Sequence, residues 1–189
     1  MSSSKHDAEV EAFVKKVGKV VEENKLDVSS DEDLSIGVMN LVAIEEHMFF
    51  TAQKTGNDKY YGLLAQAREM RKELLKKIVN KPEGEVWCTS KHLLSASMRL
   101  MEVGTKALGK GDKAGAKEYF NKSYDLYALF WALNLGQLKG HGEITKALKE
   151  ELEKENYSTK ELPPSEEEKP GFMGKMRAFL KKAVDCCRE

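Results

Sequence analysis

Four residues of the chain could hold a metal ion if folding brings them together. Cys88 and His92 are four residues apart, so a helix places them on one face. Glu46 and His47 are adjacent within an otherwise apolar stretch. Because a thiolate combined with imidazole favours zinc or a related transition metal, these residues predict a metal- or thiol-dependent site between two helices. Its expected ligands are Cys88, His92, His47 and Glu46.

The same residues also have a purely structural interpretation, which the sequence favours. Arg99 lies two helical turns beyond His92 and would neutralise Glu45 or Glu46 inside the protein. Cys88 would then be a small buried hydrophobe, and the two histidines would be hydrogen-bonded interior residues. This interpretation is preferred because a Cys and a His four apart also occur together by chance.

Signatures of known enzymes are missing from the sequence. No Glu is followed by His three residues later, as the di-iron site of ferritin-like bundles requires. Phosphate loops of the GxxxxGK[ST] type and dinucleotide loops of the GxGxxG type are missing as well. Lys plus Arg and Asp plus Glu are both 31, so no overall basic field would attract nucleic acid. The sequence therefore favours a non-enzymatic protein and predicts no nucleic-acid partner.

Hydrophobic periodicity predicts helices along the whole chain. Asp7 and Ser30 are the expected caps of the first two. The sequence thus indicates an all-α bundle of five or six helices over residues 1–156, a flexible linker over 157–171, rich in Pro, Ser, Glu and Lys, and a tethered amphipathic helix over 172–189. The expected helices of the bundle cover residues 7–24, 31–54, 58–80, 85–108, 112–133 and 143–156.

The stretch 85–127 should be the centre of this bundle, because large apolar residues occupy nearly every face of its first helix. Gly104, Gly111-Asp112, Ala116 and Phe120 follow one another at a spacing that resembles a tetratricopeptide helix pair. The resemblance covers about 35 residues and has no second copy in the chain. It implies an antiparallel hairpin in which small residues permit close approach and an aromatic ring fills the groove.

The C-terminal helix is amphipathic and basic, and it carries the functional prediction. Tethered by a linker, its apolar face must be covered by its own bundle, by a partner groove or by an anionic membrane surface. Its expected binding residues combine this apolar face with the basic side chains: Phe172, Met173, Lys175, Met176, Arg177, Phe179, Leu180, Lys181, Lys182 and Val184. The adjacent Cys186 and Cys187 resemble a site of S-acylation.

These observations predict a non-enzymatic binding or adaptor module that engages a protein partner or an anionic membrane through its last helix. The alternative is the metal- or thiol-dependent site described above. The N-terminus has no signal-peptide core, and the 3 cysteines cannot form a disulfide framework. We therefore expect a cytoplasmic protein, with peripheral association at a membrane if the last helix binds lipid.

Overall fold

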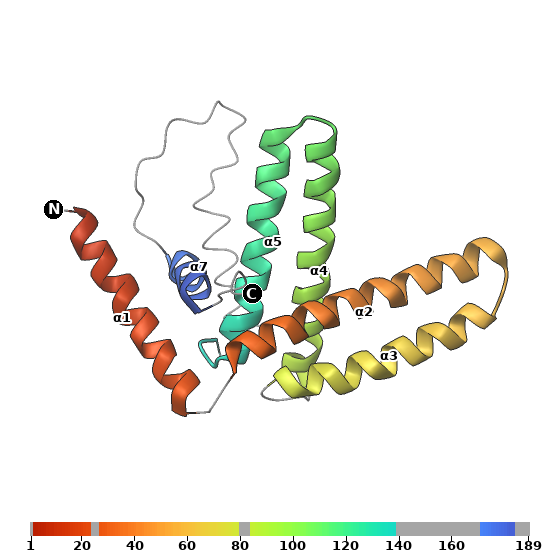
Figure 1. Cartoon of the computed structure of the whole chain (residues 1–189), viewed down its shortest axis with the longest axis horizontal. Helices are drawn as coiled ribbons and strands as arrows, with labels where there is room; N and C mark the ends of the chain where they lie inside the picture. The colour runs from red at the N-terminus through yellow and green to blue at the C-terminus, as the bar shows by residue number, and fades with distance from the viewer. Residues whose placement is uncertain (1, 24–26, 80–83, 139–170, 184–189) are drawn as a thin grey trace.

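The computed structural model describes residues 2–23, 27–79, 84–138 and 171–183. Within these ranges the chain forms α-helices and no strands, which confirms the all-α prediction. The predicted helix 143–156 and the predicted linker up to residue 170 lie outside the described residues. The helices are α1 (Ser2–Glu23), α2 (Val28–Thr55), α3 (Lys59–Ile78), α4 (Gly84–Gly109), α5 (Lys113–Asn134) and α7 (Phe172–Ala183) (Figure 1).

The helix ends correct two of the expected caps. α1 already begins at Ser2, so Asp7 lies inside the helix rather than at its start. α2 begins three residues earlier than expected because Asp27, not Ser30, is the cap: the amide of Ser30 donates to Asp27 Oδ1 at 3.1 Å. Asp112 caps α5 as expected, accepting a hydrogen bond of 2.9 Å from the amide of Gly115.

The helices α4 and α5 form the antiparallel hairpin that the tetratricopeptide resemblance implies (Figure 1). A Cβ atom on Gly104 would lie 2.7 Å from the ring of Phe120 and 3.3 Å from the carbonyl oxygen of Ala116. Glycine is therefore required where the two helices approach most closely. Ser97 and Ser123 reinforce the contact, since each hydroxyl donates to the other's backbone carbonyl, at 2.9 and 2.7 Å.

The end of α5 is the centre of the hydrophobic core. Every residue from Tyr127 to Leu135 is buried, and Phe130 packs its ring against both Tyr127 and Trp131. These aromatic residues therefore pack inside the core. The Tyr127 hydroxyl shares a 2.7 Å hydrogen bond with Ser35 of α2, and burial raises the pKa of Tyr127 to about 12.

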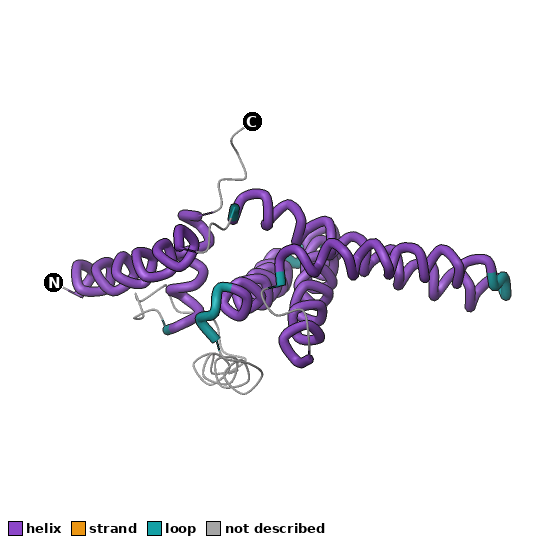
Figure 2. The backbone as a smooth tube through the Cα atoms, turned by 90° about the horizontal axis from the view of Figure 1, so that it is seen from below, coloured by secondary structure: helices purple, strands orange, loops and turns teal. Residues whose placement is uncertain are grey.

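The helix pair α2–α3 is an arm that extends from the core past α4 (Figures 1 and 2). Its inner half contributes Val38, Met39, Leu75 and Ile78 to the core, whereas its outer half lies beyond the other described helices. Figure 1 also shows that α5 is the one described helix beside the upper part of α4, where Met101 and Leu108 are exposed. The prediction that α4 is buried on nearly all sides is therefore wrong: Cys88 and His92 are exposed on its lower part as well, and the buried residues of the helix are Ser90, Leu93, Leu94, Ser97 and Gly104.

Truncating the core side of α4 should destabilise the protein strongly. Leu94 is 0% exposed, so we expect Leu94→Ala to lower the free energy of unfolding by about 2–5 kcal/mol. Met98 is only partly buried against the core, and Met98→Ala should cost less. Urea unfolding followed by circular dichroism measures both values, and equal losses would contradict this placement of the two side chains.

Adding one methyl group at Gly104 should also destabilise the hairpin. The new Cβ would overlap the Phe120 ring, and such overpacking costs about 1–3 kcal/mol, more than the roughly 1 kcal/mol that alanine gains over glycine within a helix. Gly37→Ala is the matched control, because nothing lies within 4 Å of its Cβ position in α2. Thermal melts should show a lower midpoint for Gly104→Ala and an unchanged or higher one for Gly37→Ala.

Candidate functional site

The C-terminal helix α7 lies between α1 and α5 and covers part of the core (Figure 1). Its apolar side faces inward: Met176 is 0% and Phe179 is 3% exposed. Phe172 packs edge-on against Phe13 of α1, with ring centroids 6.1 Å apart. The sequence left three surfaces that could cover this helix: its own bundle, a partner groove or an anionic membrane. In the structure the chain's own bundle covers Phe172, Met176 and Phe179.

Two basic residues of α7 form ion pairs around this apolar contact. Lys175 Nζ lies 3.3 Å from a carboxylate oxygen of Glu9 on α1. The Arg177 guanidinium binds the carboxylate of Asp125 on α5 and donates a further hydrogen bond of 3.4 Å to the carbonyl oxygen of Asn121. Asp125 is partly buried, so this second pair is better shielded from water than the first.

The remaining predicted binding residues fall into two groups. Met173, Leu180, Lys181 and Lys182 belong to α7 by position. Val184, like Cys186 and Cys187, lies outside the described residues. The helix α1 packs mainly on α7 rather than on the central pair, so α7 connects α1 to the rest of the fold.

The predicted metal ligands do not form a cluster. Cys88 and His92 are exposed on α4, His47 is exposed on α2, and Glu46 is engaged by Arg99. Among the described residues, no group of three or more His, Cys, Asp or Glu side chains could hold a metal ion. The physical reason is that these residues face solvent, whereas the sites where α2 meets α4 are occupied by packing and by an ion pair.

The predicted pairing of Arg99 with Glu46 is present, but it is not an interior contact. Their side chains are 46% and 42% exposed, and Arg99 also donates to Glu102 within α4, at 2.7 Å. Arg99 therefore forms a surface bridge between α2 and α4. Because both side chains are exposed to solvent, this ion pair contributes little to the stability of the fold.

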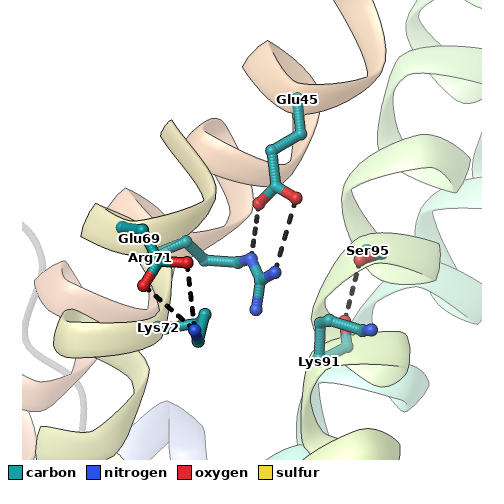
Figure 3. A network of polar contacts seen from close by, with 6 residues as sticks. All are labelled: Glu45, Glu69, Arg71, Lys72, Lys91 and Ser95. Atoms are coloured by element: carbon teal, nitrogen blue, oxygen red, sulfur yellow. Dashed lines mark hydrogen bonds and ion pairs between the residues drawn. The ribbon is translucent and has the colours of Figure 1, made fainter. Parts of the chain in front are cut away.

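The interior ion pair is a different one, between Arg71 of α3 and Glu45 of α2 (Figure 3). Arg71 Nε donates to one carboxylate oxygen of Glu45 at 2.5 Å, and Nη2 donates to the other at 3.4 Å. The Arg71 side chain is 3% exposed and that of Glu45 15%. Sequence reasoning missed Arg71, although its spacing of four from both Ala67 and Leu75 places it on the buried side of α3.

No protein-family model matches the chain, and no curated protein or solved structure is significantly similar to it. No helix in the described part of the chain is long and apolar enough to cross a membrane. The geometry thus defines an all-α protein with one peripheral amphipathic helix and one projecting helical arm.

The two ion pairs of α2 should differ sharply in energy. Removing one partner of the buried Arg71–Glu45 pair should cost about 3–5 kcal/mol, because the other charge is left without its counter-ion. A double-mutant cycle of Arg71→Met with Glu45→Gln measures the coupling by urea unfolding. The cycle of Arg99→Met with Glu46→Gln is the matched control, with an expected coupling of about 0.2–1 kcal/mol. Equal coupling in the two cycles would contradict the assignment.

Proposed function

We propose that this chain is a non-enzymatic helical binding module whose α7 is a conditional binding element for an acidic groove on a protein partner. The observation that carries the proposal is the way α7 is held: Lys175 and Arg177 pair with carboxylates on either side of the buried Met176. The surface that α7 occupies is thus apolar and flanked by acids. A partner groove of the same chemistry would compete for the same side chains.

The length of α7 supports a choice between two docked states rather than a free helix. It has 12 residues, and isolated helices of that length are marginal in water. Its apolar side therefore needs a surface, either α1 and α5 or that of a partner. Anything that weakens the intramolecular contact should increase the fraction of α7 available to bind elsewhere.

Release of α7 would also expose surface on the bundle itself. Phe13 of α1 would lose the ring of Phe172, and α1 would lose its main contact. Binding of α7 to a partner is therefore coupled to rearrangement of α1. When no acidic partner is present, the state in which α7 packs on α1 and α5 is favoured. This coupling is what makes the proposed binding conditional.

Weakening the intramolecular ion pair should enhance binding. In Asp125→Asn the Arg177 guanidinium loses its charged partner. A hydrogen bond to a charged group contributes about 1.5–3 kcal/mol to stability. Its loss should therefore raise the fraction of molecules in which α7 is released from the bundle by roughly tenfold or more. The measurement is retention on an immobilised random copolymer of glutamate and tyrosine, which offers carboxylates and aromatic rings. Retention should rise for Asp125→Asn and fall with salt.

Two controls make this experiment decisive. Glu118→Gln removes the carboxylate of an ion pair with Lys122 within α5 and should leave retention unchanged. The chain ending at Gly171 lacks α7 and should lose retention, with its helix content checked by circular dichroism. If the intact and shortened chains bind equally, α7 is not the binding element. Binding of α7 to phosphatidylserine vesicles but not to the copolymer would replace the protein partner with an anionic membrane.

A further inference from the structure

The two paired bases of α7 show that different helices hold it from opposite sides. Lys175 pairs with Glu9 of α1, and Arg177 pairs with Asp125 of α5. Residues two apart in an α-helix are separated by about 200° around its axis, so these two side chains leave α7 in nearly opposite directions. The helix α7 is therefore held between α1 and α5, as Figure 1 shows.

The two helices beside α7 differ in how firmly they are fixed. Every residue of α5 from Tyr127 to Leu135 is buried, so α5 cannot move away without opening the core. By contrast, α1 packs mainly on α7 among the described helices, and Val17 is its one buried residue between positions 8 and 23. Of the two neighbours of α7, α1 is therefore the one that can move while the core stays intact.

The contacts between α1 and α7 are local and partly exposed. The rings of Phe13 and Phe172 meet edge to face, and both residues are only partly buried. The side chains of Lys175 and Glu9 are 27% and 51% exposed, so their ion pair adds little to the attraction between the helices. A segment held by few buried contacts opens at a lower free energy than the whole fold. Separation of α1 from α7 is therefore a local event.

Such an opening changes which side chains of α7 can bind elsewhere. While α1 is in place, Phe13 and Glu9 occupy Phe172 and Lys175. Once α1 moves away, these two side chains of α7 face solvent, whereas α5 still holds the helix through Arg177. A partner groove can then contact one side of α7 before α5 releases the other. Movement of α1 is thus the step that precedes release of α7.

We propose, on the basis of the function proposed above, that α1 is an autoinhibitory helix whose movement away from α7 controls the access of an acidic partner groove to α7. The helix α5 anchors the closed state, and α1 determines how often it opens. Because α7 connects α1 to the rest of the described fold, α1 is released at least as often as α7. The strength of the α1–α7 contact therefore sets the apparent affinity for a partner.

The test is hydrogen exchange of the intact chain without a partner, measured by mass spectrometry for α1, α7 and the α4–α5 hairpin. In the unmodified chain, the amides of α1 should exchange at least as fast as those of α7. Phe13→Ala should raise the exchange rate of α7 by about tenfold, because the ring contact and its apolar area are both lost. The hairpin should keep its exchange rate, since α4 and α5 pack mainly on each other.

Matched variants separate this effect from a general loss of stability. Phe49→Ala makes the same substitution on α2, which packs mainly on α3, and should leave the exchange of α7 unchanged. Within α1, Glu9→Gln should raise the exchange rate of α7 by up to about fivefold. Glu11→Gln should have no effect, because Glu11 is exposed and lies about 200° around the helix from Glu9. Both glutamates are exposed, so neither variant should unfold the protein.

Three outcomes decide the question. Faster exchange of α1 with no change in α7 would overturn the proposal, as would an unmodified chain in which α7 exchanges faster than α1. Equal acceleration of the α4–α5 hairpin by Phe13→Ala and Glu9→Gln would overturn it too, because α1 would then belong to the core. Retention of the same variants on the copolymer of glutamate and tyrosine tests the proposed function separately. Unchanged retention with faster exchange of α7 would contradict that function but not the control of α7 by α1.

Discussion

The close approach of α4 and α5 is the contact on which the other helices depend. It requires Gly104 opposite Phe120, and the reciprocal hydrogen bonds of Ser97 and Ser123 satisfy polar groups that the approach buries. With the helices so close, the end of α5 presents Tyr127, Phe130 and Trp131 as a surface against which other elements pack. The arm and the C-terminal helix both use that surface, from different sides.

The arm shows how one fold can combine a fixed base with an exposed end. At its base, Ser35 bonds to Tyr127 and Arg71 neutralises Glu45, so polar groups as well as apolar ones fix the position of α2 and α3. Toward its tip, the buried contact is reduced to alanines. The exposed large apolar residues there, Phe49, Phe50, Tyr61 and Leu63, add nothing to the buried core of the described chain.

The C-terminal helix also combines apolar and charged side chains, but its apolar residues are buried rather than exposed. Its apolar residues are covered, and its bases Lys175 and Arg177 are paired with acids of α1 and α5. The same features that suggested a partner-binding helix are therefore satisfied within the chain. The sequence of an amphipathic helix does not show whether it packs on its own chain or on a partner, because the same free energy terms govern both contacts.

The sequence by itself determined which stretches of the described chain are helical, because helical periodicity and glycine turns are local properties, whereas two of the expected caps, Asp7 and Ser30, were wrong. It also determined the α4–α5 hairpin, since Gly104, Asp112, Ala116 and Phe120 lie close together along the chain. Only the tertiary structure decided which charges are buried. Arg99 pairs with Glu46 at the surface, whereas Arg71 pairs with Glu45 in the interior. In the sequence Arg71 is one of several Lys and Arg residues of α3. It likewise left Cys88, His92 and His47 exposed and covered Met176 and Phe179. Periodicity shows that a face is apolar, but which surface covers it depends on the angle and position of helices far apart in the sequence.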